Sequence, residues 1–147
     1  MTDEQGQVEA FHREFDIAIA GRPGLPDDTT RRLRERLIEE EFAELREAMT
    51  QGSVPHIAKE LADLLYVVYG TAVSCGIDME PVFREVHRSN MSKVGGHKRA
   101  DGKWVKPATY SPAQVEPILH RQGWTVEPPQ SPDGSNAPHQ RTGVTSA

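Results

Sequence analysis

Cysteine and long apolar segments are scarce in this 147-residue sequence, and each scarcity excludes a class of protein. Cys75 is the only cysteine, so no disulfide can form within the chain, as is typical of a reducing compartment. The most apolar stretch, residues 61–75, is too short to span a bilayer and contains Asp63. The first residues are polar and lack the basic start and apolar run of a secretory signal. We therefore expect a cytoplasmic protein that does not enter a membrane.

Basic residues are also fewer than acidic residues, 17 against 22. The formal net charge is −5 at pH 7, which makes nucleic acid an improbable partner for the whole protein. The length suits one domain with a hydrophobic core of its own, which we expect over residues 1–124. Residues 125–147 hold four prolines and almost no large apolar side chains, a composition typical of a disordered tail.

Apolar residues recur at helical spacing in the first two thirds of the sequence. This pattern predicts four helices, over residues 8–20, about 28–50, about 54–74 and 79–92. Glycine and proline at residues 21–26 separate the first two, and Gly52 separates the second from the third. Asp27, Asp28 or Thr29 can cap the second helix, and Asp78 can cap the fourth. Apolar side chains point in most directions of the third helix, so we expect it to be central and largely buried.

Beyond the fourth helix the pattern changes. Residues 93–110 are rich in glycine and basic residues and have no clear period, so we expect a loop in which Trp104-Val105 is the only candidate strand. Residues 112–122 predict a short helix capped by Ser111. The expected fold is an all-α, four-helix bundle with a basic C-terminal arm and a disordered tail.

Four carboxylates interrupt the apolar faces of the second and third helices. On a helical wheel Glu41 falls inside the apolar arc and Glu44 lies at its edge. Asp63 is the only charge between residues 61 and 73, and Glu60 stands one turn earlier on the same face. If the two helices form an antiparallel hairpin about Gly52, Glu44 lies level with Glu60, and Glu41 lies level with Asp63. The sequence therefore predicts two matched layers of carboxylates.

Carboxylates packed this closely repel one another and need a positive partner. Lys59 or Arg46 can supply an ion pair, but one or two such cations do not satisfy four or five carboxylates. A hard divalent cation is the stronger candidate, and all-oxygen ligands favour Mg²⁺, with Mn²⁺ as a substitute. A solvated acidic face is the ordinary alternative for residues 39–41. A di-iron bundle would need two Glu-x-x-His pairs, and residues 9–12 supply the only one.

These carboxylates match a known pattern. Glu40-Glu41-x-x-Glu44 followed by Glu60-x-x-Asp63 resembles the signature of the all-α nucleoside triphosphate pyrophosphohydrolases, which include MazG, the dimeric dUTPases, the dCTPases and phosphoribosyl-ATP pyrophosphohydrolase. The resemblance covers roughly residues 8–120 and implies a homodimer or homotetramer. It implies that a carboxylate of the motif activates the attacking water, with Glu40 or Glu41 as the candidate. The metal ligands that it implies are Glu41, Glu44, Glu60 and Asp63.

The basic arm resembles the branch of this superfamily that contains MazG and phosphoribosyl-ATP pyrophosphohydrolase, through residues 86–93 and 101–110. Residues 84–106 carry seven Lys or Arg against two acids, whereas residues 35–63 carry eight acids against three bases. A triphosphate needs metal on one side and cationic donors on the other. The candidate substrate-binding residues are Asn90, Lys93, Lys98, Lys103, Lys106 and Tyr110.

The expected activity is Mg²⁺-dependent hydrolysis of a nucleoside triphosphate to the monophosphate and pyrophosphate. The resemblance favours nucleotide-pool house-cleaning, with dUTP or another pyrimidine deoxynucleotide as the first substrate to test. The alternative is a non-catalytic helical dimer whose acidic groove binds a basic partner. The two differ in their need for divalent metal.

Overall fold

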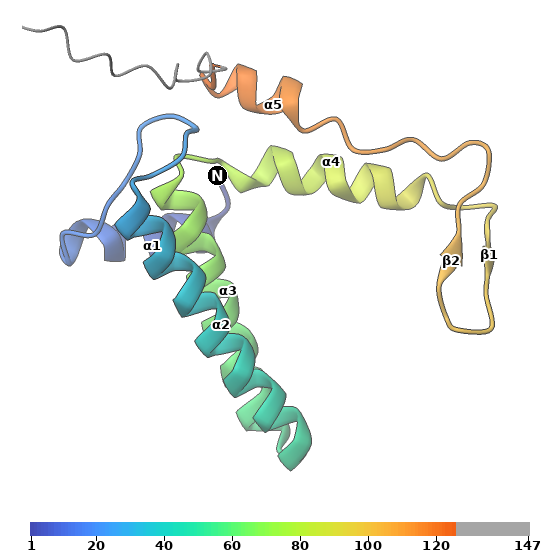
Figure 1. Cartoon of the computed structure of the whole chain (residues 1–147), viewed down its shortest axis with the longest axis horizontal. Helices are drawn as coiled ribbons and strands as arrows, with labels where there is room; N and C mark the ends of the chain where they lie inside the picture. Colours follow the sequence, from blue (N-terminus) through green and yellow to red (C-terminus); the bar gives the residue numbers. More distant parts are fainter. Residues whose placement is uncertain (126–147) are drawn as a thin grey trace, which may run out of the picture.

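The computed structural model describes residues 1–125, and all but a small hairpin of its regular structure is helical (Figure 1). Its elements are the helices α1 (Asp3–Glu14), α2 (Asp28–Gln51), α3 (Val54–Ser74), α4 (Met79–Met91) and α5 (Glu116–Arg121), and the strands β1 (His97–Lys98) and β2 (Trp104–Val105). The all-α prediction is confirmed. The predicted tail lies, except for Thr125, outside the described residues.

Helices α2 and α3 form the antiparallel hairpin on which the carboxylate register depends. The side chain of Asp27 accepts a hydrogen bond from the backbone N–H of Thr30 at 2.9 Å and caps the start of α2. Gly52 ends α2 in the left-handed region, with φ of 74°, a conformation that costs glycine little. The two helices then pack along each other (Figure 1), so the predicted hairpin about Gly52 is confirmed.

The first helix was predicted too late in the sequence. Thr2 accepts a hydrogen bond from the Gln5 N–H at 3.3 Å, which starts α1 at Asp3. Asp16 adopts a positive φ of 53° just after α1 ends at Glu14. The apolar residues 17–19 that prompted a longer helix belong to a loop instead. That loop is tied to the end of α3 by the hydrogen bond from the Ala20 N–H to the Val73 carbonyl, 3.2 Å.

The C-terminal segment runs back beside α4 instead of joining the helices directly (Figure 1). The Gln114 N–H donates to Glu85 at 2.8 Å, and the Ser111 N–H donates to Ser92 Oγ at 2.9 Å. These bonds tie residues 111–114 to α4, and α5 begins only at Glu116 and not at residue 112 as predicted. Within the predicted loop, residues 97–98 pair with residues 104–105, which confirms the one candidate strand.

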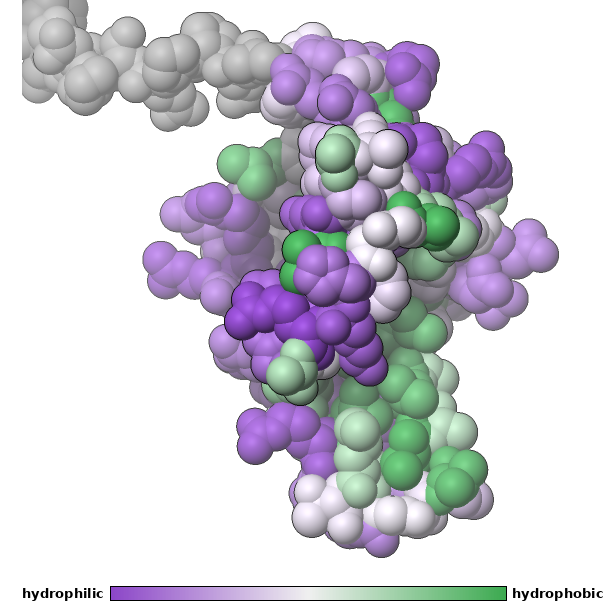
Figure 2. All heavy atoms as spheres, turned by 90° about the vertical axis from the view of Figure 1, so that its right-hand side faces the viewer, coloured by the Kyte–Doolittle hydropathy of each residue, from purple (hydrophilic) through white to green (hydrophobic). Residues whose placement is uncertain are grey.

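One face of the helical core is open in the single chain. Helix α4 departs from α3 at 114°, so α1 and α2 pack on α3 but α4 does not lie along it. Leu61 and Leu65 of α3 are therefore 47% and 55% exposed, and Phe83 of α4 is 70% exposed. Figure 2 shows apolar side chains gathered on this side of the molecule. The expectation that α3 is largely buried is wrong for one chain alone.

No single helix among residues 1–125 is long and apolar enough to cross a membrane. Helices α3 and α4 reach the required length and apolarity only when the two are counted together across their bend.

Candidate active site

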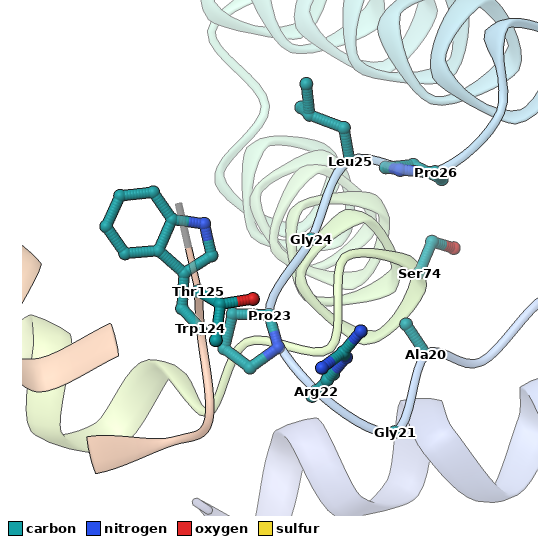
Figure 3. Close-up of a pocket in the computed structure, with 10 residues that line it drawn as sticks. All are labelled: Ala20, Gly21, Arg22, Pro23, Gly24, Leu25, Pro26, Ser74, Trp124 and Thr125. Carbon is teal, nitrogen blue, oxygen red and sulfur yellow. The ribbon is translucent and has the colours of Figure 1, made fainter. Parts of the chain in front are cut away.

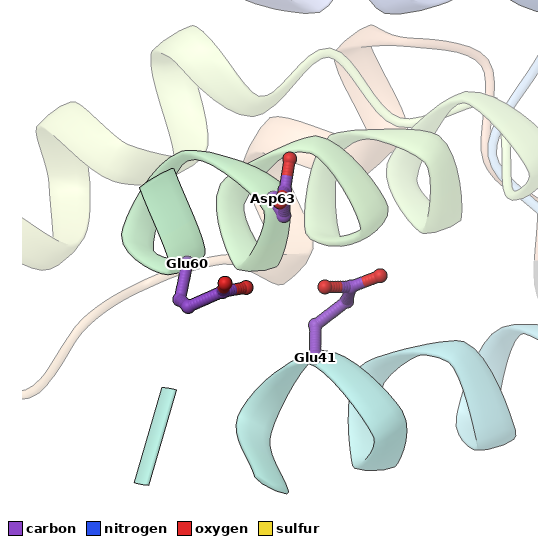
Figure 4. A group of neighbouring side chains, drawn as sticks. All are labelled: Glu41, Glu60 and Asp63. Atoms are coloured by element: carbon purple, nitrogen blue, oxygen red, sulfur yellow. The ribbon is translucent and has the colours of Figure 1, made fainter. Parts of the chain in front are cut away.

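Three carboxylates converge between α2 and α3 (Figure 4). Glu41 comes from α2, and Glu60 and Asp63 come from α3 on one face, three residues apart. One ligand oxygen from each lies within 4.8 Å of the other two. Caps at Asp27 and Gly52 fix the hairpin, and the hairpin sets this register. The predicted meeting of Glu41 with Asp63 is thus present in the structure.

The three carboxylates differ in their surroundings. Glu60 is 2% exposed, whereas Glu41 and Asp63 are half-buried. Burial, followed by the nearby charges of Glu44 and Asp63, raises the pKa of Glu41 above its ordinary value. The negative charge of Glu41 is therefore only partly compensated by its surroundings.

Lys59 supplies positive charge to the same cluster. Its ammonium lies 2.8 Å from Asp63 Oδ2, 3.1 Å from Glu60 Oε1 and 3.9 Å from Glu44 Oε2. Hydrogen bonds to Asp63 and then Glu60 raise the pKa of Lys59. His56 Nε2 lies 3.0 Å from Glu60 Oε1, the same oxygen that Lys59 approaches. Of the two cations considered from the sequence, Lys59 reaches the carboxylates, and Arg46 has no ion pair within residues 1–125.

The cluster fits a hard divalent cation. Its ligands are all carboxylate oxygens, the donors that Mg²⁺ and Mn²⁺ prefer. Two of the three ligands are half-exposed, so water and phosphate oxygens can reach the remaining coordination positions. Glu41, Glu60 and Asp63 would hold such an ion.

The other two predicted acidic residues lie at the margin of the cluster. The side chain of Glu44 is 57% exposed and approaches Lys59 but is not one of the three converging carboxylates. Glu40 is exposed. Their roles as ligand and as general base stay predictions.

The predicted substrate-binding residues lie on α4 and the arm, apart from the carboxylates of their own chain (Figure 1). Asn90 accepts a hydrogen bond from Lys93 Nζ at 2.6 Å, and Lys106 lies over the ring of Tyr110 with its Nζ 4.1 Å from the centroid. A hydrogen bond with Ser89, followed by one with Lys106, lowers the pKa of Tyr110. Lys98 and Lys103 are exposed on the hairpin that contains β1 and β2. Within one chain the acidic cluster and these basic candidates therefore lie apart, and the substrate-binding role of the candidates stays a prediction.

A buried polar network that the sequence did not reveal joins α1, α2 and α3. Arg34, 6% exposed, donates from Nε to Ser74 Oγ at 3.0 Å and from Nη2 to His12 Nε2 at 3.2 Å. Since arginine only donates, the proton of His12 is on Nδ1, which donates to the Ala18 carbonyl at 3.2 Å. Burial lowers the pKa of His12. One feature of the sequence pointed weakly to this network: His12 follows the core residue Val8 by one helical turn and so lies on the same face of α1.

A cavity of about 350 Å³ lies beside this network (Figure 3). The loop of residues 20–26 forms most of its wall, with Ser74 from the end of α3 and Trp124 and Thr125 from the C-terminal segment. Glu60 and Asp63 belong to the first half of α3, so this cavity is separate from the carboxylate cluster.

Comparison with known families agrees with this geometry. The model of the phosphoribosyl-ATP pyrophosphohydrolase family matches residues 8–90, a stretch that includes all the acidic candidates and ends at Asn90. No curated protein matches the chain. The chain therefore belongs to the phosphoribosyl-ATP pyrophosphohydrolase family, within the MazG-like superfamily of all-α enzymes that hydrolyse acid anhydride bonds of nucleotides and generally depend on divalent metal.

Proposed function

We propose that the protein hydrolyses a nucleoside triphosphate to the monophosphate and pyrophosphate with Mg²⁺, for which Mn²⁺ can substitute. The convergence of Glu41, Glu60 and Asp63 within 4.8 Å carries this proposal. When bound there, the cation would polarise the phosphates and lower the pKa of coordinated water. Family membership supports the reaction class, and the choice among nucleotides is part of the proposal.

Glu40 or Glu41 takes the proton of the attacking water in this mechanism. Glu40 is exposed and is not one of the three converging carboxylates, so it stays free to accept a proton while the cation is bound. The water oxygen forms a bond to phosphorus while the α–β anhydride bond breaks. The water proton passes to this carboxylate, and the bonding electrons leave with pyrophosphate. Glu41, one position further along α2, is the alternative acceptor.

The leaving pyrophosphate carries several negative charges, which the basic arm would neutralise. In one chain the arm lies apart from the carboxylates (Figure 1). We infer that the enzyme is a homodimer or homotetramer in which the arm of one protomer reaches the carboxylates of another. An apolar groove of about 590 Å³ at the elbow between α3 and α4, lined by Leu65, Val68 and Phe83, supports this pairing because it leaves a large apolar surface open.

Phosphorus NMR of the reaction mixture tests the bond that breaks, with dUTP first and the other canonical nucleotides after it. Pyrophosphate and monophosphate in equal amounts are expected. Orthophosphate and a nucleoside diphosphate as first products would contradict the mechanism. Absence of hydrolysis, together with a melting temperature unchanged by Mg²⁺, would favour the non-catalytic dimer that binds a basic partner.

Subunit mixing tests the shared site. Glu41→Gln protomers lack the acidic half, and Lys93→Gln protomers lack part of the basic half. If the site is shared, mixing the two impaired proteins restores up to roughly a quarter of the activity, because random pairing makes about half of the dimers mixed and each mixed dimer has one intact site of its two. If mixing restores nothing although light scattering shows mixed dimers, each chain must build its site alone.

A further inference from the structure

We propose that Lys59 is an internal counter-ion that the metal must displace, so that this lysine sets the metal concentration at which the enzyme becomes loaded. The inference rests on the proposed function, because it concerns the same carboxylates. It goes beyond that function by assigning a role to a residue outside the acidic motif.

Lys59 and the metal compete for the same charge. The ammonium of Lys59 has three N–H donors, and carboxylates of three residues, Glu44, Glu60 and Asp63, lie within 3.9 Å of it. Glu60 and Asp63 are also two of the three residues that converge as metal ligands. A divalent cation and an ammonium held by the same carboxylates repel each other strongly at this range. Binding of the metal therefore requires Lys59 to leave.

The structure makes Lys59 the partner that moves. Its side chain is 61% exposed, whereas that of Glu60 is 2% exposed. A lysine on a four-carbon stem can turn into solvent at small cost, because water replaces the lost hydrogen bonds. Glu60 cannot follow it, since its side chain is buried on α3 and also contacts His56 Nε2 at 3.0 Å. The carboxylates thus stay in place while their counter-ion is exchanged.

This arrangement also explains how the protein tolerates the cluster when metal is scarce. A buried carboxylate without a positive or hydrogen-bonding partner is strongly destabilising. Lys59 and His56 both contact Glu60, so the metal-free protein keeps its fold. The cost of this protection is a weaker affinity for metal.

Isothermal titration calorimetry with Mn²⁺ on the full chain tests the proposal through binding alone. Lys59→Met keeps most of the unbranched side chain and removes its charge, and we expect the Kd for Mn²⁺ to fall about fivefold. Lys59→Arg keeps the positive charge, and its planar guanidinium can donate two parallel hydrogen bonds to a carboxylate. The Kd of this variant for Mn²⁺ should therefore be at least as high as that of the wild type. Arg13→Gln is the matched control. It removes one positive charge from an exposed ion pair with Glu9, away from the cluster, and should leave the Kd unchanged.

The outcomes separate this proposal from the proposed function. If the wild type binds Mn²⁺ and Lys59→Met binds it no more tightly, Lys59 is not a competitor, and the metal-dependent enzyme stands. An equal gain in Arg13→Gln would overturn the proposal as well, because overall charge would then explain the effect. If the wild type binds no Mn²⁺, both proposals fail. Should Lys59→Met fail to fold without metal, Lys59→Arg decides: tighter Mn²⁺ binding by this variant would refute the competition.

Discussion

Replacing Glu41 with glutamine should stabilise the metal-free protein, although Glu41 is proposed to be essential for turnover. Glutamine keeps the shape of glutamate and removes its charge. Glu41 has a raised pKa because burial and neighbouring carboxylates disfavour its ionised form. The variant therefore relieves a repulsion that the wild type tolerates in order to bind metal.

The magnitude follows from the spacing of the cluster. At the 4.8 Å that bounds the three ligand oxygens, two unit charges repel by about 0.9 kcal/mol in water and about 3.5 kcal/mol at an effective dielectric constant of 20. Glu41 is half-exposed, and Lys59 offsets part of the charge on Glu60 and Asp63, so the repulsion energy lies near the lower of these two values. We expect a gain of about 1 kcal/mol, which raises the melting temperature by about 3 °C in a chain of this size.

Thermal melts in EDTA and in Mg²⁺ measure both halves of this prediction. In EDTA at pH 7, Glu41→Gln should melt above the wild type. In saturating Mg²⁺ the order should reverse, because the variant has lost a ligand and gains less from the cation. The advantage in EDTA should disappear as the pH falls below about 4.5, the ordinary pKa of the group, since the wild-type carboxyl is then protonated in both folded and unfolded chains.

A matched control stands two residues away. Glu39→Gln makes the same chemical change on an exposed position of α2 and should alter neither melt. If Glu41→Gln is less stable than the wild type in EDTA, Glu41 is a structural partner of a nearby cation, and the reasoning about crowded carboxylates is refuted.

Three further predictions concern the rest of the chain. Stability should fall as the pH drops below about 6.5, because the unfolded chain binds a proton that buried His12 resists, and His12→Gln should flatten this loss in urea melts. Gly70→Ala should lower the free energy of unfolding by about 1–3 kcal/mol, because the new Cβ would lie 3.0 Å from Arg34 Nη1 and 3.1 Å from His12 Nε2. Gly24→Ala is the control in the same urea melts, since its Cβ would meet nothing within 4 Å. Deleting residues 128–147, which lie outside the described residues, should change neither the melting temperature nor kcat; a large loss of kcat would contradict the interpretation of this segment as a dispensable tail.

The carboxylate register was predictable because it depends on local signals alone. Asp27 caps α2 and Gly52 ends it, and both effects operate within a few residues. Once the hairpin is fixed, equal sequence distances from Gly52 place Glu41 opposite Asp63. No long-range information is needed, so simple counting found two of the three converging carboxylates and placed the third, Glu60, one turn away.

The end of α1 was not predictable from the same kind of counting. Residues 17–19 are as apolar as a helix face, but their loop is tied to α3 instead, through Ala20 and Val73. Apolar spacing alone therefore does not distinguish a helix from a loop of the same composition, and Ile19 is 37% exposed in the loop that forms. The sequence likewise did not decide which carboxylates Lys59 contacts, since a long side chain on a helix surface can turn towards several neighbours.

The exposed face of α3 and the distance between the two halves of the site have one structural cause. The departure of α4 at 114° leaves α3 uncovered and also carries Asn90 and the lysines of the arm away from their own carboxylates. Apolar periodicity in α3 indicated that this face is buried, but a sequence pattern does not say which chain provides the cover. A second copy seated in the elbow would bury Leu65 and Phe83 and bring basic residues towards an acidic cluster in the same step. One contact therefore explains both observations: in the proposed dimer, the interface at the elbow between α3 and α4 buries the exposed apolar face and also completes the active site.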